Sequence, residues 1–337
     1  MQHESYHQRS ETILTCRSSP APNRYDVALM IRSRVAFDAH GHASGCAATG
    51  SERRSNADLR DHPARSGRDC PAGGSPVRIG LVLSGGGLRG ASHVGVLQRL
   101  VEHAIPIDVI VGSSAGAVVA AYYAAVGLTV EDLVRDAERF RGRHLMAHSL
   151  SVRLDGRLGA AFTKISGLIP ERLAQLEEAT FDRLHHDVRG IGVACHDVAS
   201  GRPCYFATGA DRSVRLGDVV RASASIPLLF PPISVECADD HATLLLTDGG
   251  VSDCLPIDFA RRPPLGATHL IVSDCRWFAG RRPSSDERIV YVRPRLPSTG
   301  TLWAPASTLA SAVREGTRAV TSEMLTAIRG WARRVAI

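Results

Sequence analysis

Apolar residues in the central part of the chain follow spacings that predict strands alternating with helices. The continuous apolar run 78–84 is typical of a strand buried on both faces of a parallel sheet. Apolar residues then recur on one face of a helix over 94–101, and a second buried strand follows at 108–111. An apolar helix leaves that strand and ends near Val126. This β-α-β-α order requires parallel strands joined by right-handed crossovers.

The pattern downstream adds further strands and helices but leaves 129–187 undefined beyond its first helix. The expected elements are an amphipathic helix at 131–140, strands at 188–195 and 203–207 joined by a turn at 199–201, a helix at 216–224, strands at 243–247, 269–273 and 288–292, and a helical tail at 305–335. Together the elements predict an α/β fold of three layers, α/β/α, with a mainly parallel central sheet.

The first 77 residues differ from the rest in composition. They are rich in Ser, Arg, His, Gly and Pro, and they hold five of the 14 histidines. Apart from a short stretch at 27–37, they show no sustained helical or alternating apolar period. We therefore predict a disordered or non-domain leader over 1–77.

Charge is unevenly distributed along a chain that is otherwise ordinary for a globular protein. The net charge is +6, and Lys164 is the only lysine. Residues 276–337 carry eleven arginines against four acidic residues. Such a basic segment can attract anionic lipid headgroups, although a solvated surface in an Arg-biased protein is the favoured explanation. No module of aromatic and basic residues accompanies the charge, so we expect no nucleic-acid partner.

Cysteine spacing and hydropathy bear on where the chain resides. The eight cysteines lack the paired short spacing of a zinc site or a disulfide scaffold, although their even number leaves disulfides open. The apolar stretch 115–128 is too short to span a membrane, and the N-terminus lacks the features of a secretory signal. We expect a cytoplasmic protein, with peripheral contact at a membrane left open.

The pentapeptide Gly112-Ser113-Ser114-Ala115-Gly116 is the first candidate for chemistry. A buried strand precedes it and an apolar helix follows, which is the setting of a nucleophile elbow with Ser114 as nucleophile. The two glycines leave room for the substrate carbonyl, and the helix start favours developing negative charge. On its own the pattern is explained equally well by a Gly-Ser turn without chemistry.

A glycine-rich loop follows the first strand and supplies the second candidate. It matches the dinucleotide-binding pattern G-x-G-x-x-G, but the acidic residue at the expected distance, Asp108, begins its strand instead of ending it. An oxyanion loop fits better, because amides of consecutive glycines can bind the oxygen of a tetrahedral intermediate. The candidate residues of this oxyanion hole are Gly85, Gly86, Gly87, Arg89 and Gly90.

A nucleophilic serine also needs a base, and Asp248 is a better candidate than histidine. The only histidine after Asp248 is His269, which leads into a strand, whereas an α/β-hydrolase histidine sits on a loop after one. Asp248 ends an apolar strand and precedes Gly249 and Gly250. Partial burial there would raise the pKa of its carboxyl and make it a usable base. Taken alone, this tripeptide is better explained as a β-turn.

The three motifs together, in this order and spacing, resemble those of the patatin-like phospholipase family. That family combines a loop of the form G-G-G-x-R/K-G, a G-x-S-x-G elbow and a later D-G-A/G. The resemblance covers roughly 78–275 and is loose beyond. Supporting segments are Gly95-Val96-Leu97, the run 220–227 before Phe230-Pro231-Pro232, and Leu255-Pro256, while 251–254 depart from the many relatives that carry Asn there.

The resemblance implies a Ser–Asp dyad without histidine, metal or organic cofactor. Ser114 would attack a lipid acyl ester and Asp248 would accept its proton, giving an acyl-enzyme that water releases. Amides around Gly86 and Gly87 would hold the oxyanion, with Arg89 stabilising charge or binding a phosphate headgroup. Residues 78–275 would then be an acyl hydrolase domain of phospholipase A or lysophospholipase type, and 276–337 an Arg-rich extension. A catalytically silent lipid-binding or regulatory module is the alternative, and the oligomeric state is left open.

Overall fold

A sheet of eight strands runs through the part of the chain that the computed structural model describes, residues 76–210, 214–238, 242–278, 286–296 and 306–333. All of these residues belong to one unit, Gly67–Ile337. The strands are β1 (Ile79–Leu83), β2 (Val109–Ser113), β3 (Gly190–Asp197), β4 (Arg202–Ala207), β5 (Ile233–Glu236), β6 (Thr243–Asp248), β7 (His269–Ser273) and β8 (Ile289–Val292). The predicted leader lies almost wholly outside the described residues.

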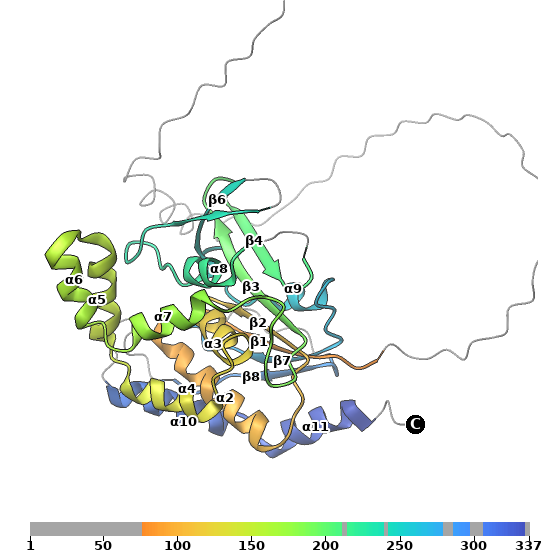
Figure 1. Ribbon diagram of the computed structural model, residues 1–337. Helices are drawn as coiled ribbons and strands as arrows, with labels where there is room; N and C mark the ends of the chain where they lie inside the picture. Colours follow the sequence, from red (N-terminus) through yellow and green to blue (C-terminus); the bar gives the residue numbers. More distant parts are fainter. Residues whose placement is uncertain (1–75, 211–213, 239–241, 279–285, 297–305, 334–337) are drawn as a thin grey trace, which may run out of the picture. The chain divides into compact units, whose positions relative to one another are not determined.

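The centre of the sheet is parallel and one side is antiparallel. The strand order is β5-β6-β3-β2-β1-β7-β8, with β4 pairing β3. Strands β3, β2, β1, β7 and β8 run parallel to one another, whereas β4, β6 and β5 join by antiparallel pairing (Figure 1). The predicted α/β class with a mainly parallel sheet is confirmed.

Helices connect these strands and form the outer layers. They are α2 (Ala91–Glu102), α3 (Ala115–Ala124), α4 (Val130–Arg139), α5 (Gly142–Arg153), α6 (Gly156–Lys164), α7 (Ile169–Glu177), α8 (Leu216–Ser223), α9 (Ile257–Arg261), α10 (Ala306–Ala319) and α11 (Ser322–Arg333), with 3₁₀ turns η2 (Gly87–Gly90) and η3 (Gly249–Val251). In the segment 129–187, the apolar pattern predicted only the first helix. The structure has three further helices there, α5, α6 and α7. The predicted helical tail is two helices, divided where Thr321 Oγ1 accepts from the Met324 amide at 3.3 Å.

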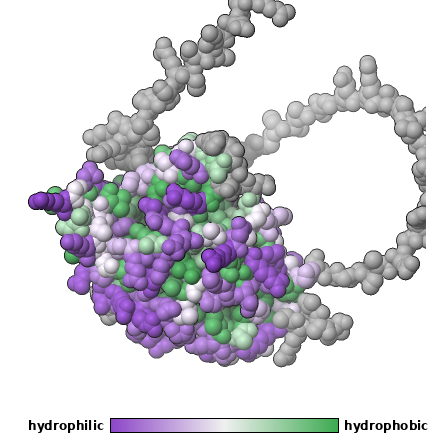
Figure 2. Space-filling view, in the orientation of Figure 1, coloured by the Kyte–Doolittle hydropathy of each residue, from purple (hydrophilic) through white to green (hydrophobic). Residues whose placement is uncertain are grey.

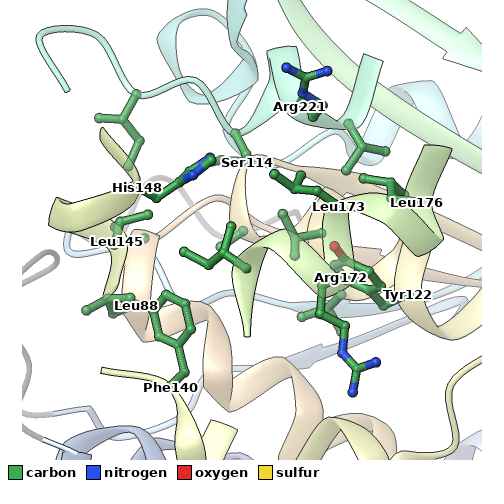
Figure 3. Close-up of a pocket in the computed structure, with 18 of the residues that line it drawn as sticks. Leu88, Ser114, Tyr122, Phe140, Leu145, His148, Arg172, Leu173, Leu176 and Arg221 are labelled. Carbon is green, nitrogen blue, oxygen red and sulfur yellow. The ribbon is translucent and has the colours of Figure 1, made fainter. Parts of the chain in front are cut away.

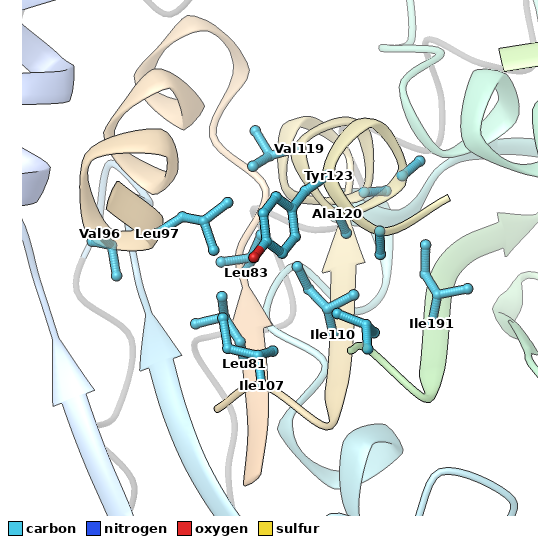
Figure 4. Close-up of a cluster of buried hydrophobic side chains, with 14 of the residues drawn as sticks. Leu81, Leu83, Val96, Leu97, Ile107, Ile110, Val119, Ala120, Tyr123 and Ile191 are labelled. Atoms are coloured by element: carbon cyan, nitrogen blue, oxygen red, sulfur yellow. The ribbon is translucent and has the colours of Figure 1, made fainter. Parts of the chain in front are cut away.

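Burial on both faces explains the continuous apolar run of β1. Leu81 and Leu83 belong to the larger core, which also contains buried residues of α2 and α3 (Figure 4). Val82 belongs to a second core on the other face, where Phe259 and Ala260 of α9 pack. Since successive side chains of a strand point to opposite faces, each position of β1 must be apolar.

The segment after residue 275 is part of the same unit. Strand β8 pairs with β7, and α10 packs along α2. The two helices approach so closely that a Cβ on Gly95 would lie 1.8 Å from the Val313 carbonyl oxygen. Among the described residues, the structure contains no helix long and apolar enough to cross a membrane.

Candidate active site

Two strands of opposite direction end at neighbouring positions of β3 and so bring Ser114 and Asp248 together. Strand β2 runs parallel to β3 and its last residue, Ser113, pairs with Ala194. Strand β6 runs antiparallel to β3 and its last residue, Asp248, pairs with Cys195. The carboxyl ends of β2 and β6 therefore meet head to head, with Ser114 immediately beyond one end and Asp248 at the other.

The backbone at Ser114 makes the sharp turn expected of an elbow. Its φ of 52° and ψ of −122° place a non-glycine residue in a region that such residues rarely adopt. The Ser114 Oγ donates a hydrogen bond of 2.6 Å to Asp248 Oδ2, and both residues are buried. The two candidate residues thus form a direct hydrogen-bonded pair.

Further hydrogen bonds fix the orientation of both members of the pair. The Gly250 amide donates to Asp248 Oδ1 at 2.8 Å. The Ser114 amide donates to Ser223 Oγ at 2.9 Å, and this hydroxyl donates to the Ala194 carbonyl at 2.7 Å. Ser223 of α8 was not among the predicted site residues, because its role depends on how α8 packs against β3.

Burial changes the acidity of Asp248. It raises the pKa of the carboxyl from 3.8 to about 6, while the hydrogen bonds from Ser114 and the Gly250 amide act in the lowering direction. A carboxylate with a pKa near 6 is ionised at neutral pH and is a stronger base than an ordinary aspartate.

The glycine loop lies directly beside Ser114. A Cβ on Gly85 would be 3.3 Å from the Ser114 Cβ, and the Gly85 amide already donates to the Cys254 carbonyl at 2.8 Å. Within the described part of the chain, the amides of Gly86 and Gly87 have no hydrogen-bond acceptor. Gly90 instead packs against Ala115 at the start of α3. Of the predicted oxyanion residues, Gly86 and Gly87 are those whose amides are available.

Arg89 points to other partners. Its Nε donates to the Cys275 carbonyl at 2.8 Å, and its guanidinium carbon lies 5.3 Å from the centre of the Trp277 ring. Arg89 does not contribute to the lining of the cavity that contains Ser114. The geometry therefore gives no support to direct contact between Arg89 and the reacting centre.

An apolar cavity of about 360 Å³ opens at Ser114. Residues of α3, α4, α5 and α7 form much of its wall, and Figure 3 shows Leu88, Phe140, Leu145 and Leu173 around it. Few charged residues line the cavity. They include Arg221 and the ion pair of Arg172 and Asp136, in which Nε and Oδ2 are 2.6 Å apart. This lining suits a long apolar group with a polar end.

His148 lies in the cavity wall and was missed by the sequence reasoning, which searched for histidine only after Asp248. Burial, and next the charge of Arg221, lower the pKa of His148. His269, the histidine that was considered, begins β7, with Nδ1 2.9 Å from Thr268 Oγ1 and its ring against Trp331. Strands β1, β2 and β7 are parallel, His269 begins β7, and Ser114 follows the end of β2. His269 and Ser114 therefore lie at opposite ends of the parallel strands.

No group of three or more His, Cys, Asp or Glu side chains in the described residues is arranged to hold a metal ion. The structure describes five cysteines, and no disulfide joins any two of them: Cys195, Cys204, Cys237, Cys254 and Cys275.

Gly112→Ala should destabilise the fold through the elbow. A Cβ there would lie 2.3 Å from the Gly116 carbonyl carbon and the Ala117 amide nitrogen, which are backbone atoms that cannot rotate away. We expect the free energy of unfolding in urea to fall by about 3 kcal/mol. The control is Gly330→Ala in α11, where a Cβ has open space and helix propensity favours alanine by about 1 kcal/mol. Equal urea midpoints for Gly112→Ala and the wild type would contradict this account of the turn.

Known proteins resemble the chain over the region that contains this site. A patatin-like phospholipase domain-containing protein of Caenorhabditis elegans is 33% identical over 202 residues, covering 58% of this chain and 13% of that protein. A lysophospholipase of Aspergillus fumigatus is 32% identical over 198 residues, covering 58% and 12%. The chain thus spans about an eighth of the length of these relatives. Among solved structures, VipD from Legionella pneumophila has a TM-score of 0.45 at 15% identity, covering 76% of this chain and 67% of that one.

A family model gives the assignment. The model of the patatin-like phospholipases matches residues 81–261, which include the glycine loop, the elbow and the aspartate. Because this match takes in more than half of the 337 residues, the chain belongs to the patatin-like phospholipase family.

Proposed function

We propose that the chain is a lipid acyl hydrolase of phospholipase A or lysophospholipase type, with Ser114 as nucleophile and Asp248 as base. The observation that carries the proposal is the 2.6 Å hydrogen bond from Ser114 Oγ, which lines an apolar cavity, to Asp248 Oδ2. Family membership and the lysophospholipase among the relatives support a lipid ester as substrate.

In the first half-reaction, Ser114 Oγ attacks the ester carbonyl carbon while its proton passes to Asp248. The amides of Gly86 and Gly87 donate to the oxyanion of the tetrahedral intermediate, aided by the N-terminus of α3. Collapse breaks the bond to the alcohol, which takes the proton from Asp248 as it leaves. In the second half-reaction, Asp248 removes a proton from water and the hydroxide attacks the acyl carbonyl carbon. The bond from that carbon to Ser114 Oγ then breaks, the fatty acid leaves, and the proton passes from Asp248 to Ser114 Oγ.

The cavity supports a long-chain acyl ester as the class of substrate. Its apolar wall favours an acyl chain, because each buried methylene group contributes about 0.8 kcal/mol. Arg221 and His148 in the lining offer polar contacts to the substrate's headgroup side. We therefore place the acyl chain along the apolar wall, with the ester carbonyl at Ser114.

A fluorophosphonate probe and lipid product analysis test this function. We expect the probe to label wild type at Ser114, as mapped by peptide mass spectrometry, and the protein to release fatty acid from phosphatidylcholine or lysophosphatidylcholine vesicles. Ser113→Ala is the matched control, because the Ser113 Oγ is buried without a described partner, and it should still be labelled. Label on another residue, or lipid binding without fatty-acid release, would reject the proposal, the latter in favour of a silent lipid-binding module.

A further inference from the structure

Helices α5 and α6 form a helical hairpin that packs mainly on itself. Helix α5 contacts α6 extensively and α7 only slightly. In Figure 1 the hairpin projects from the body of the unit, in yellow-green. Because the hairpin packs little against the rest of the unit, apolar side chains exposed on it are available for contact with another surface.

Several large apolar side chains of the hairpin are exposed to solvent. Leu158 is 64% exposed, and Leu150, Val152 and Ile165 are also exposed. Figure 2 shows hydrophobic and hydrophilic side chains intermixed over this part of the surface. Single exposed leucines are ordinary, but a group of them on one projecting element indicates a contact surface.

Leu228 extends this surface from a neighbouring loop. Its side chain is 67% exposed, and its φ of 72° is a left-handed conformation that costs free energy in a leucine. Helix α5 holds the loop, because Arg153 donates to the carbonyls of Leu228 and Leu229, and Ser149 Oγ also donates to the Leu229 carbonyl. The hairpin thus fixes a backbone that keeps Leu228 facing solvent.

The same hairpin is strongly basic. Residues 142–164 contain four cationic side chains and a single acidic one, Asp155. Arg143, Arg157 and Lys164 are exposed and form no salt bridge with any residue that the structure describes.

The Arg-rich segment after residue 275 differs from the hairpin only in part. Arg276 and Arg293 both pair with the buried Asp274, and Arg318 pairs with Glu315. Arg295, Arg314 and Arg329 are exposed and form no salt bridge with a described residue, so charge alone does not separate the two segments. The hairpin combines its basic residues with four exposed apolar side chains, which makes it the better candidate for contact with an anionic bilayer.

The exposed apolar surface is continuous with the cavity. Val152 is exposed and also contributes to the cavity lining. Leu145 and His148 of the same helix are less exposed and line the same cavity (Figure 3). A lipid chain that enters past Val152 therefore meets apolar side chains along the way to Ser114.

We propose that the α5–α6 hairpin, together with Leu228, binds a bilayer that contains anionic lipids and places the cavity opening against it. Exposed apolar residues interspersed with unpaired basic ones are typical of segments that lie in the membrane interface. The inference deepens the proposed lipid hydrolysis, on which it rests, by naming the surface through which the enzyme meets its substrate.

Vesicle sedimentation of the full chain tests the charge component. Wild type should bind vesicles of equal parts phosphatidylcholine and phosphatidylglycerol more tightly than vesicles of phosphatidylcholine alone. The combined variant Arg143→Glu, Arg157→Glu, Lys164→Glu should partition onto the anionic vesicles roughly 100-fold less, because each basic residue near such a surface contributes roughly fivefold. The matched control reverses three exposed arginines elsewhere, Arg202→Glu, Arg262→Glu and Arg314→Glu, and should bind like wild type.

A second variant tests the contribution of the apolar side chains to vesicle binding, and a folding check accompanies every variant. Leu158→Ser with Ile165→Ser should weaken binding to both kinds of vesicle, while thermal unfolding checks that each variant is folded. Equal binding by the hairpin variants and wild type, an equal loss in the arginine control, or no vesicle binding by wild type would overturn the inference.

Two further measurements distinguish a failure of bilayer binding from a failure of the proposed hydrolysis. Ser114→Ala should sediment with vesicles like wild type, because binding requires no turnover. Wild-type turnover of a water-soluble ester measures the catalytic pair without any bilayer. Binding without turnover would reject the hydrolase, and turnover of the soluble ester without vesicle binding would reject only the docking surface.

Discussion

Ser114→Ala should lower kcat/KM for a water-soluble p-nitrophenyl ester by about 10⁴-fold or more. Without the hydroxyl no acyl-enzyme can form, and the amides of Gly86 and Gly87 can stabilise only direct attack by water. The substitution removes a single buried oxygen, so the thermal unfolding temperature should change little. The elbow geometry is retained, because the strained turn depends on Gly112 and Gly116 and not on the hydroxyl.

Ser113→Ala is the control with which the kcat/KM of Ser114→Ala is compared. Ser113 is the adjacent residue, is equally buried and carries the same functional group, but its Oγ makes no hydrogen bond to the described residues. We expect its turnover to stay within a few-fold of wild type. Comparable rates for Ser114→Ala and wild type would show that Ser114 is not the nucleophile.

Asp248→Asn should lower turnover by about 10²–10⁴-fold, the usual contribution of a general base. The asparagine can still accept from the Gly250 amide but cannot take the Ser114 proton. In wild type, kcat/KM should fall about tenfold for each pH unit below the Asp248 pKa of about 6, because the protonated carboxyl is no longer a base. The residual activity of Asp248→Asn should lack this inflection.

His148→Gln is the discriminating control for the pH profile, because His148 also lines the cavity and burial lowers the pKa of its imidazole from the ordinary 6.5. If Asp248 is the base, the inflection near pH 6 persists in His148→Gln, whatever happens to KM. Loss of the inflection in that variant, with its retention in Asp248→Asn, would transfer the role of base to His148.

The same carboxyl should make Asp248→Asn more stable than wild type at alkaline pH. The folded-state pKa of about 6 lies above the ordinary 3.8, so this residue's favourable contribution to stability is complete below pH 3.8 and is lost as pH rises through 6. The ionised form then costs up to about 3 kcal/mol, which an uncharged asparagine avoids. Urea unfolding at pH 8 and pH 4 should show a gain for the variant that shrinks at the lower pH.

The apolar pattern predicted the parts of the fold that rest on local physics. Strands β1 and β2 are buried on both faces, so apolar residues and glycine fill their positions up to Ser113 at the end of β2, which makes them easy to recognise. The elbow was predictable for a related reason, because the strand, glycines and helix that form it are contiguous in sequence.

Features that arise from long-range packing were not predictable. The Gly85 amide donates a hydrogen bond to the Cys254 carbonyl, and the Arg89 side chain donates one to the Cys275 carbonyl. Both acceptors lie more than 150 residues away in the sequence. His148 was missed because histidine was searched for only after Asp248, and its place in the cavity wall depends on how α5 packs. Only the folded arrangement shows which polar group meets which.

The head-to-head meeting of β2 and β6 on β3 means that backbone register sets the alignment of the proposed catalytic pair, Ser114 and Asp248. Side chains alternate between the two faces of a strand, so a slip of β6 by one residue against β3 would turn the Asp248 carboxylate to the opposite face. Much of the backbone hydrogen bonding could survive such a slip, and the molecule would be folded yet inactive. For the proposed Ser114–Asp248 pair, we therefore expect specific activity to fall in proportion to the fraction of molecules in which β6 is out of register, a fraction that helical content would not reveal.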